Sequence, residues 1–92
     1  LDAIVAACDM TATGTIQALV ATGRRVPDDV AVVGFDDSVL AALTTPPLTS
    51  VRQPVEEMTT LAVRDLLQGR VHDGWYQSFP VSLTVRASSR PT

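Results

Sequence analysis

The start of the chain alternates between two hydrophobic patterns. Residues 3–8, AIVAAC, form a continuous apolar run, which is typical of a strand in a parallel sheet covered on both faces. The next apolar side chains recur at helical spacing, at Ala12, Ile16, Leu19 and Val20. Asp9 is placed to cap this predicted helix, and Gly23 to end it in the left-handed conformation that follows many helices.

The middle of the chain repeats the alternation of strand and helix. Residues 30–33 are a second apolar, β-branched run, which Gly34 ends. A short helix is predicted over residues 39–43, with Asp37 or Ser38 as its cap. A Pro-Pro pair follows shortly afterwards and prevents the helix from continuing.

The second half predicts one more unit of this kind. Residues 48–53 form a third strand, and Pro54 is placed where the first turn of a helix tolerates proline. This helix runs to about residue 68 and ends before Gly69. Residues 78–89 alternate in part and predict a last strand, with the final residues as a tail. The apolar stripe of the helix consists of Val55, Met58, Ala62 and Leu66.

Strands that alternate with helices predict an α/β fold, a parallel sheet flanked by helices with right-handed crossovers. Ligands of open α/β sheets bind beyond the carboxyl ends of the strands. Polar pairs fall at these ends of the first three predicted strands: Cys8–Asp9, Asp36–Asp37 and Arg52–Gln53. We therefore expect a binding site where these pairs converge.

Composition limits the classes of protein that fit. Ninety-two residues, 46% apolar and 18% charged, suffice for one small globular domain. The net charge is −3 and the seven basic residues are scattered arginines, which argues against a nucleic-acid-binding surface. No apolar run reaches the roughly 20 residues of a membrane helix. The single cysteine excludes an internal disulfide and favours the cytoplasm, and the absence of an initiator Met leads us to expect a longer parent protein.

The adjacent acids Asp36 and Asp37 allow three interpretations. A metal site would need three or four converging ligands, for example with Asp9. The chain has no lysine and no glycine-rich phosphate loop, which argues against phosphoryl transfer. A helix cap is the simplest role for Asp37. Asp36 lies closer to the strand and is placed to accept hydrogen bonds from a ligand's hydroxyl groups. We expect the protein to bind no metal or cofactor and to have no catalytic residue.

Three segments together resemble the C-terminal part of the LacI/GalR family of transcriptional repressors: AIVAACDMTATGTIQAL, RVPDDVAVVGFDDS and TPPLTSVRQPVEEM. Their order and spacing match the family, and the resemblance covers almost all of the chain. The effector domain of these repressors is similar to periplasmic sugar-binding proteins, with two α/β lobes and the effector between them. The resemblance implies a fragment of such a two-lobed domain.

The resemblance also implies how the chain divides between the lobes. Residues 1–52 would be part of the C-terminal lobe, and residues 53–79 a crossing plus a helix of the N-terminal lobe. Residues 80–92 would return to the C-terminal lobe and end in a tail. In such a domain, the apolar stripe of the helix beginning at Pro54 would pack against the rest of the N-terminal lobe, which lies outside this chain. We therefore expect association between chains, exchange of elements, or packing of this helix on the chain's own sheet.

The partners implied by the resemblance are a small sugar-like effector and a second copy of the protein, with no membrane. DNA would be bound only by an N-terminal helix-turn-helix outside this chain. The ligand-facing residues would be Asp36, Phe35, Gln53, Cys8 and Asp9. Cys8 stands where the family usually has an asparagine that touches the effector. The dimer surface would involve Val39, Leu40, Leu43 and Thr13.

Two other classes of protein stay open on the residues alone. An extracytoplasmic sugar-binding protein of a transport system shares the fold, and a signal peptide in place of a helix-turn-helix would distinguish it. A small α/β enzyme would combine Asp9, Asp36 and Asp37 with a divalent metal. Bound metal near these acids would distinguish the enzyme.

Overall fold

The computed structural model describes residues 1–90, and the order of its elements confirms the predicted alternation. The elements are β1 (Ala3–Val5), α1 (Asp9–Ala21), β2 (Ala31–Phe35), α2 (Val39–Leu43), β3 (Thr49–Arg52), α3 (Val55–Leu67), β4 (Ser82–Thr84) and the 3-10 helix η1 (Ala87–Ser89). The strand predicted over residues 78–89 is shorter than expected, because η1 takes up its end. Residues 91–92 of the predicted tail lie outside the described residues.

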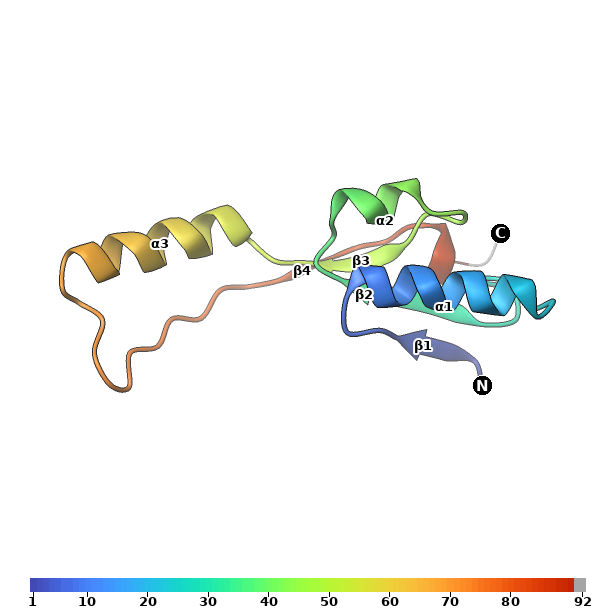
Figure 1. The fold of residues 1–92 in the computed structure, drawn as a ribbon, viewed down its shortest axis with the longest axis horizontal. Helices are drawn as coiled ribbons and strands as arrows, with labels where there is room; N and C mark the ends of the chain where they lie inside the picture. Colours follow the sequence, from blue (N-terminus) through green and yellow to red (C-terminus); the bar gives the residue numbers. More distant parts are fainter. Residues whose placement is uncertain (91–92) are drawn as a thin grey trace.

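The strands form one sheet in the order β1-β2-β3-β4 (Figure 1). Neighbouring strands from β1 to β3 are parallel, as predicted, while β4 is antiparallel to β3. The direction of β4 follows from the path of the chain, which leaves the sheet after β3 through α3 and returns alongside. The sheet is therefore mostly parallel, and β3 and β4 together connect it to α3.

The hydrophobic core lies between the sheet and α1, with α2 beside them. It is built from small and branched side chains: Ala6, Ala12, Ile16, Val32, Ala41 and Leu48. The expectation that both faces of the first apolar run are covered is wrong, since β1 lies at the edge of the sheet and Val5 is 77% exposed. An apolar run in the sequence indicates a strand, but it does not tell whether helices cover one or both faces of that strand.

Gly34 allows α1 to approach β2 closely. A Cβ atom at this position would overlap Asp9 Oδ1 and would lie 2.8 Å from Leu48 Cδ2. Only glycine fits here, because the side chains of Asp9 and Leu48 occupy the space that a Cβ atom at position 34 would need. As a result, the carboxylate of Asp9 lies directly against β2, one residue before that strand ends.

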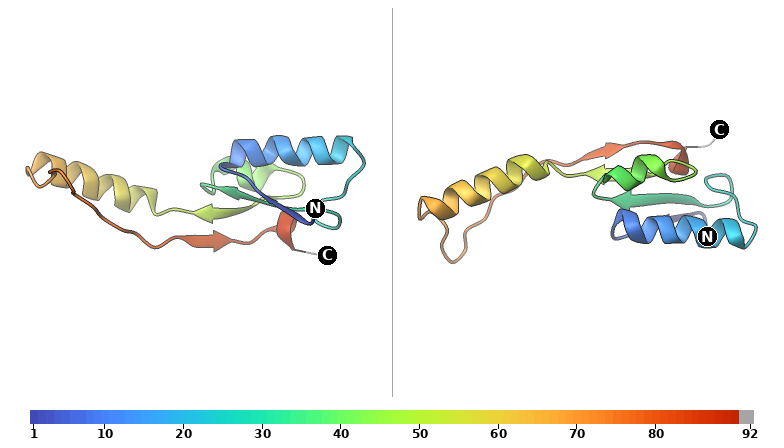
Figure 2. Two further views of the ribbon diagram at one scale, coloured as in Figure 1. Left: turned by 90° about the horizontal axis from the view of Figure 1, so that it is seen from below. Right: turned by 45° about the horizontal axis from the view of Figure 1, so that its top comes forward.

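Helix α3 projects away from the sheet as an arm (Figures 1 and 2). The molecule measures 54 × 21 × 17 Å along its principal axes as a consequence. The prediction that the apolar stripe of α3 packs on the chain's own sheet is wrong, because Val55 and Leu66 of this stripe are 55% and 65% exposed. Association or exchange between chains stays a prediction. No helix among residues 1–90 is long and apolar enough to cross a membrane.

Candidate functional site

A cavity of about 480 Å³ lies where β2 and β3 end and α3 begins. Two of the three polar pairs predicted at strand ends meet in it, Asp36–Asp37 and Arg52–Gln53. The first turn of α3 completes its lining with Pro54, Val55, Glu56 and Glu57. Cys8 and Asp9 do not line the cavity, although the sequence predicts them for the same site.

Asp36 presents its carboxylate to this cavity from a left-handed turn. Its φ is 116° and that of Asp37 is 50°, conformations that cost a non-glycine residue on the order of 1–3 kcal/mol. The Asp36 N–H donates to the carbonyl of Val51 at 2.9 Å, and Gln53 Nε2 donates to Asp36 Oδ1 at 2.9 Å. Backbone and side chain of Asp36 are thus both held by the β3 segment, in a position to accept hydrogen bonds from a ligand.

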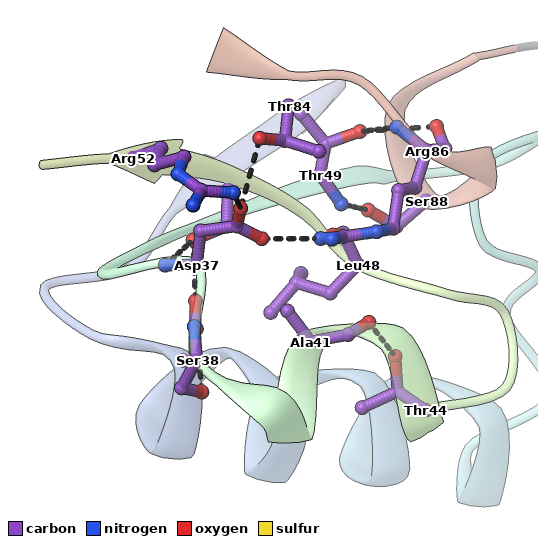
Figure 3. A network of polar contacts seen from close by, with 12 residues as sticks. Asp37, Ser38, Ala41, Thr44, Leu48, Thr49, Arg52, Thr84, Arg86 and Ser88 are labelled. Carbon is purple, nitrogen blue, oxygen red and sulfur yellow. Dashed lines mark hydrogen bonds and ion pairs between the residues drawn. The ribbon is translucent and has the colours of Figure 1, made fainter. Parts of the chain in front are cut away.

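Asp37 turns its carboxylate the other way, into the protein, and its side chain is only 3% exposed. Arg86 Nη1 lies 2.7 Å from Oδ1, Thr84 Oγ1 donates to Oδ2 at 2.9 Å, and Arg52 Nη1 lies 3.7 Å from Oδ2 (Figure 3). Burial raises the pKa of Asp37, but Arg86, Thr84 and Arg52 together outweigh burial and hold it below its usual value. The interpretation of Asp37 as the cap of α2 is wrong, because Ser38 occupies that position.

Asp9 is a buried anchor and does not cap α1. Cys8 occupies the cap position, and Asp9 lies in the first turn with 2% exposure. Its Oδ2 accepts hydrogen bonds from the Ser38 N–H at 2.7 Å and the Ser38 hydroxyl at 2.8 Å. Its Oδ1 accepts one from the Ser50 hydroxyl at 2.6 Å, and Ser50 Oγ in turn accepts from the Asp37 N–H at 2.9 Å. The carboxylate therefore joins α1, β3 and the turn that carries Asp36.

Cys8 and Phe35 lie at the same end of the sheet, outside the lining of the cavity. Cys8 is half-buried, with its Sγ 3.3 Å from Thr11 Oγ1. Hydrogen bonds with the side chain and backbone of Thr11 lower the pKa of the thiol. Phe35 is 36% exposed at the end of β2. Both are accessible to a ligand only where it extends beyond the cavity of residues 36–57.

The acids do not converge on a metal site. Within residues 1–90, no group of three or more His, Cys, Asp or Glu side chains is arranged to hold a metal ion. The carboxylates of Asp9 and Asp37 are directed to donors within the protein, and of these three acids Asp36 alone turns its carboxylate to the cavity, where one oxygen accepts from Gln53. The geometry gives no support to the metal-dependent enzyme.

A second surface feature lies between α1 and α2. Val39 and Leu43 are 81% and 71% exposed, while Leu40 and Thr13 are half-buried. A cavity of about 380 Å³ lies beside them, lined by Thr13, Ile16, Gln17, Leu40, Leu43, Thr44 and Thr45. The residues predicted for the dimer surface are thus neighbours in space, on a face with exposed apolar side chains.

The sequence reasoning missed Arg86, Thr84 and Ser50. Ser50 is completely buried, where a hydroxyl needs a hydrogen-bond partner. A polar residue inside a predicted buried strand was the available signal for Ser50. Nothing local marks Arg86, because its partners lie far away in the chain.

The chain matches the family model described as periplasmic binding protein-like domain over residues 2–89. It is 58% identical over 66 residues to the HTH-type transcriptional regulator MalR of Streptomyces coelicolor. These 66 residues are 72% of this chain and 19% of MalR. The chain therefore spans about a fifth of the length of this curated relative.

Two solved structures share the fold. A LacI family transcriptional regulator from Lactobacillus casei with bound sucrose superposes with a TM-score of 0.80 and 40% identity, over 95% of this chain and 33% of that one. The lac repressor dimer bound to operator and the anti-inducer ONPF gives a TM-score of 0.84 and 34% identity, over 96% of this chain and 27% of that one.

Proposed function

Because this chain belongs to the LacI family of transcriptional regulators, which are not enzymes, we propose that it forms part of a cleft that binds a sugar or similar small polar effector. The observation that carries this proposal is the carboxylate of Asp36, which faces the cavity and is held at one oxygen by Gln53. Carboxylates accept strong hydrogen bonds from hydroxyl groups, which fits a polyhydroxylated ligand. The bound sucrose in the Lactobacillus casei regulator supports the same chemistry.

The residues of the site take different roles in this proposal. Asp36 and Gln53 contact the effector directly, and Phe35 and Cys8 contact those parts of it that extend beyond the cavity. Asp9 has its oxygens occupied by protein donors, so we assign it the role of holding the turn in place. Neither a cofactor nor a metal enters the proposal.

The arm formed by α3 supports a division into lobes. Residues 1–52 belong in this proposal to the C-terminal lobe, residues 53–79 to a crossing and a helix of the N-terminal lobe, and residues 80–92 to the return. The exposed stripe of α3 would then be covered by the rest of the second lobe. An effector held between the lobes would favour one arrangement of them and so change the affinity for DNA by its differential binding.

DNA binding and dimerisation complete the proposal. An N-terminal helix-turn-helix outside this chain would contact DNA, since this chain carries a net charge of −3 and its arginines are scattered. The face with Val39, Leu40, Leu43 and Thr13 would pair with a second copy, in line with the dimer seen for the lac repressor. The identity to HTH-type transcriptional regulators such as MalR favours a cytoplasmic regulator over the alternative of an extracytoplasmic transport protein.

Calorimetry on the full-length regulator tests the proposal. Glucose, sucrose and cellobiose are titrated into wild type, Asp36→Ala and Asp28→Ala, where the last removes an exposed carboxylate far from the cavity. We expect one of these sugars to bind wild type and Asp28→Ala alike, and Asp36→Ala to bind it at least about tenfold more weakly, the value of one charge-assisted hydrogen bond. Unchanged affinity of Asp36→Ala would remove Asp36 from the site.

A further inference from the structure

The two adjacent acids of the site act as one unit, although their carboxylates point in opposite directions. We propose that Asp37, through its buried pairing with Arg86, is the positioning residue that holds Asp36 in the cavity and couples effector binding to the arrangement of β3 and β4. This inference rests on the proposed function, which it deepens: Asp36 contacts the effector, and Asp37 acts through Asp36.

The pairing of Asp37 with Arg86 is well buried. The two side chains are 3% and 22% exposed, and the atoms of the ion pair are 2.7 Å apart. Arg86 is itself fixed, because its Nη1 donates to the carbonyl of Leu48 at 2.8 Å and its N–H to Thr49 Oγ1 at 2.7 Å. Figure 3 shows this cluster between β3 and the segment that follows β4. Removal of one partner would leave the other charge without its nearest counter-charge in a largely buried position, which proteins tolerate poorly.

The turn explains why Asp36 depends on Asp37. Two consecutive non-glycine residues with positive φ persist only where the surroundings fix them. The backbone contacts are the Asp36 N–H, which donates to Val51, and the Asp37 N–H, which donates to Ser50. The Asp37 carboxylate adds Thr84 and two arginines, of which Arg86 at 2.7 Å lies much closer than Arg52 at 3.7 Å. Without this close ion pair the turn can relax toward a less strained backbone. Such a relaxation would carry the Asp36 carboxylate away from Gln53.

The same carboxylate contacts both strands that lead to α3. Thr84 of β4 donates to Asp37, and Arg52 of β3 lies 3.7 Å away with a side chain that is 69% exposed. Arg52 pairs with Ser82 across β3 and β4, and Ser50 pairs with Thr84. A change in the twist of these two strands would therefore alter the contacts of Asp37, and through them the position of Asp36. An effector on Asp36 would in turn favour the strand arrangement in which Asp37 keeps its partners.

The test compares variants of Arg86 in the full-length regulator. Arg86→Met keeps the apolar stem without the charge, and Arg86→Lys keeps the charge. Asp37→Asn removes the other partner, and Arg24→Met is the matched control at an exposed arginine outside the cluster. Thermal melts establish that each variant is folded. Crystal structures without effector then show whether Gln53 Nε2 still donates to Asp36 Oδ1, and calorimetry measures the affinity for whichever of glucose, sucrose and cellobiose binds wild type.

We expect Arg86→Met and Asp37→Asn to lose the Gln53–Asp36 hydrogen bond and to bind the sugar roughly tenfold more weakly or worse. Arg86→Lys and Arg24→Met should keep both the hydrogen bond and the affinity, a rescue that a merely space-filling role would not produce. Folded Arg86→Met or Asp37→Asn with an intact hydrogen bond, or Arg86→Lys as impaired as Arg86→Met, would overturn the inference. If the hydrogen bond is lost as expected but wild type binds none of the sugars, the sugar proposal fails while the positioning role of Asp37 is supported.

Discussion

Replacing Asp9 by Asn removes one charge from the interior and exchanges one carboxylate oxygen for an amide group of nearly the same size. Asp9 is 2% exposed and accepts three hydrogen bonds, two from Ser38 and one from Ser50. An amide nitrogen toward Ser38 would meet a backbone N–H that can only donate. An amide nitrogen toward Ser50 would leave the Ser50 hydroxyl proton without its acceptor, because an amide NH2 group can only donate.

The orientation with the amide nitrogen toward Ser50 is the less costly of the two, and it therefore determines the expected loss of stability. It loses one hydrogen bond to a charged acceptor, worth about 1.5–3 kcal/mol, and leaves one buried hydroxyl unsatisfied at about 1–3 kcal/mol. Part of this is offset, since the neutral amide avoids the cost of burying a charge. We therefore expect the free energy of unfolding to fall by about 2–3 kcal/mol.

Urea unfolding at neutral pH, followed by circular dichroism, measures this difference. Asp28→Asn is the matched control, because this acid is exposed, and its expected effect is within about 0.5 kcal/mol of zero. A loss of less than about 0.5 kcal/mol for Asp9→Asn, with an unchanged denaturant slope, would refute the assignment of Asp9 as a buried anchor.

Three further predictions use the same measurements. Gly34→Ala should destabilise the protein by about 1–3 kcal/mol, since the added Cβ would overlap Asp9 Oδ1. Gly14→Ala, with nothing within 4 Å of the added Cβ, should instead stabilise α1 by up to about 1 kcal/mol. Equal effects of the two changes in urea unfolding would contradict the close packing of α1 on Gly34. The pKa of Asp37 lies below its ordinary 3.8 in the folded state, so the carboxylate stabilises the fold at any pH above 3.8, and this stabilisation is lost as the pH falls through the lowered pKa. From about pH 5 downward, the free energy of unfolding should therefore fall less steeply for Asp37→Asn than for wild type. Parallel curves would argue against the pairing with Arg86. Asp36→Gly should raise the free energy of unfolding by about 1 kcal/mol, because glycine tolerates a φ of 116°, while sugar affinity falls; a destabilised Asp36→Gly would show that the turn is not strained.

The fold was largely predictable because its determinants are local. Helical spacing of apolar residues, the proline at the start of α3 and the glycine after α1 each act within a few residues, and all were interpreted correctly. The alternation of strands and helices then implies a mostly parallel sheet. The rule that ligands bind at strand ends brought Asp36 and Gln53 together, and the structure joins them by a hydrogen bond.

The direction of β4 and the position of α3 were decided by tertiary structure. The pattern of residues 78–89 predicts a strand without telling its direction, which depends on where the chain returns to the sheet. The apolar stripe of α3 likewise predicts that the helix has a partner, and does not tell whether that partner lies in this chain. Its exposure is consistent with a partner elsewhere.

The sequence by itself determined which residues are acidic and that Asp36 follows a strand, and it placed Asp9 and Asp37 where a helix cap would be. Capping is a local rule, and it predicts the nearest backbone N–H as the partner of each carboxylate. The folded chain offers several donors from far along the sequence: Ser38 and Ser50 lie 29 and 41 residues from Asp9, and Thr84 lies 47 residues from Asp37. A buried carboxylate is stabilised most by charge and by several donors at once, and only the tertiary structure brings these together around Asp9 and Asp37, leaving Asp36 to face the cavity.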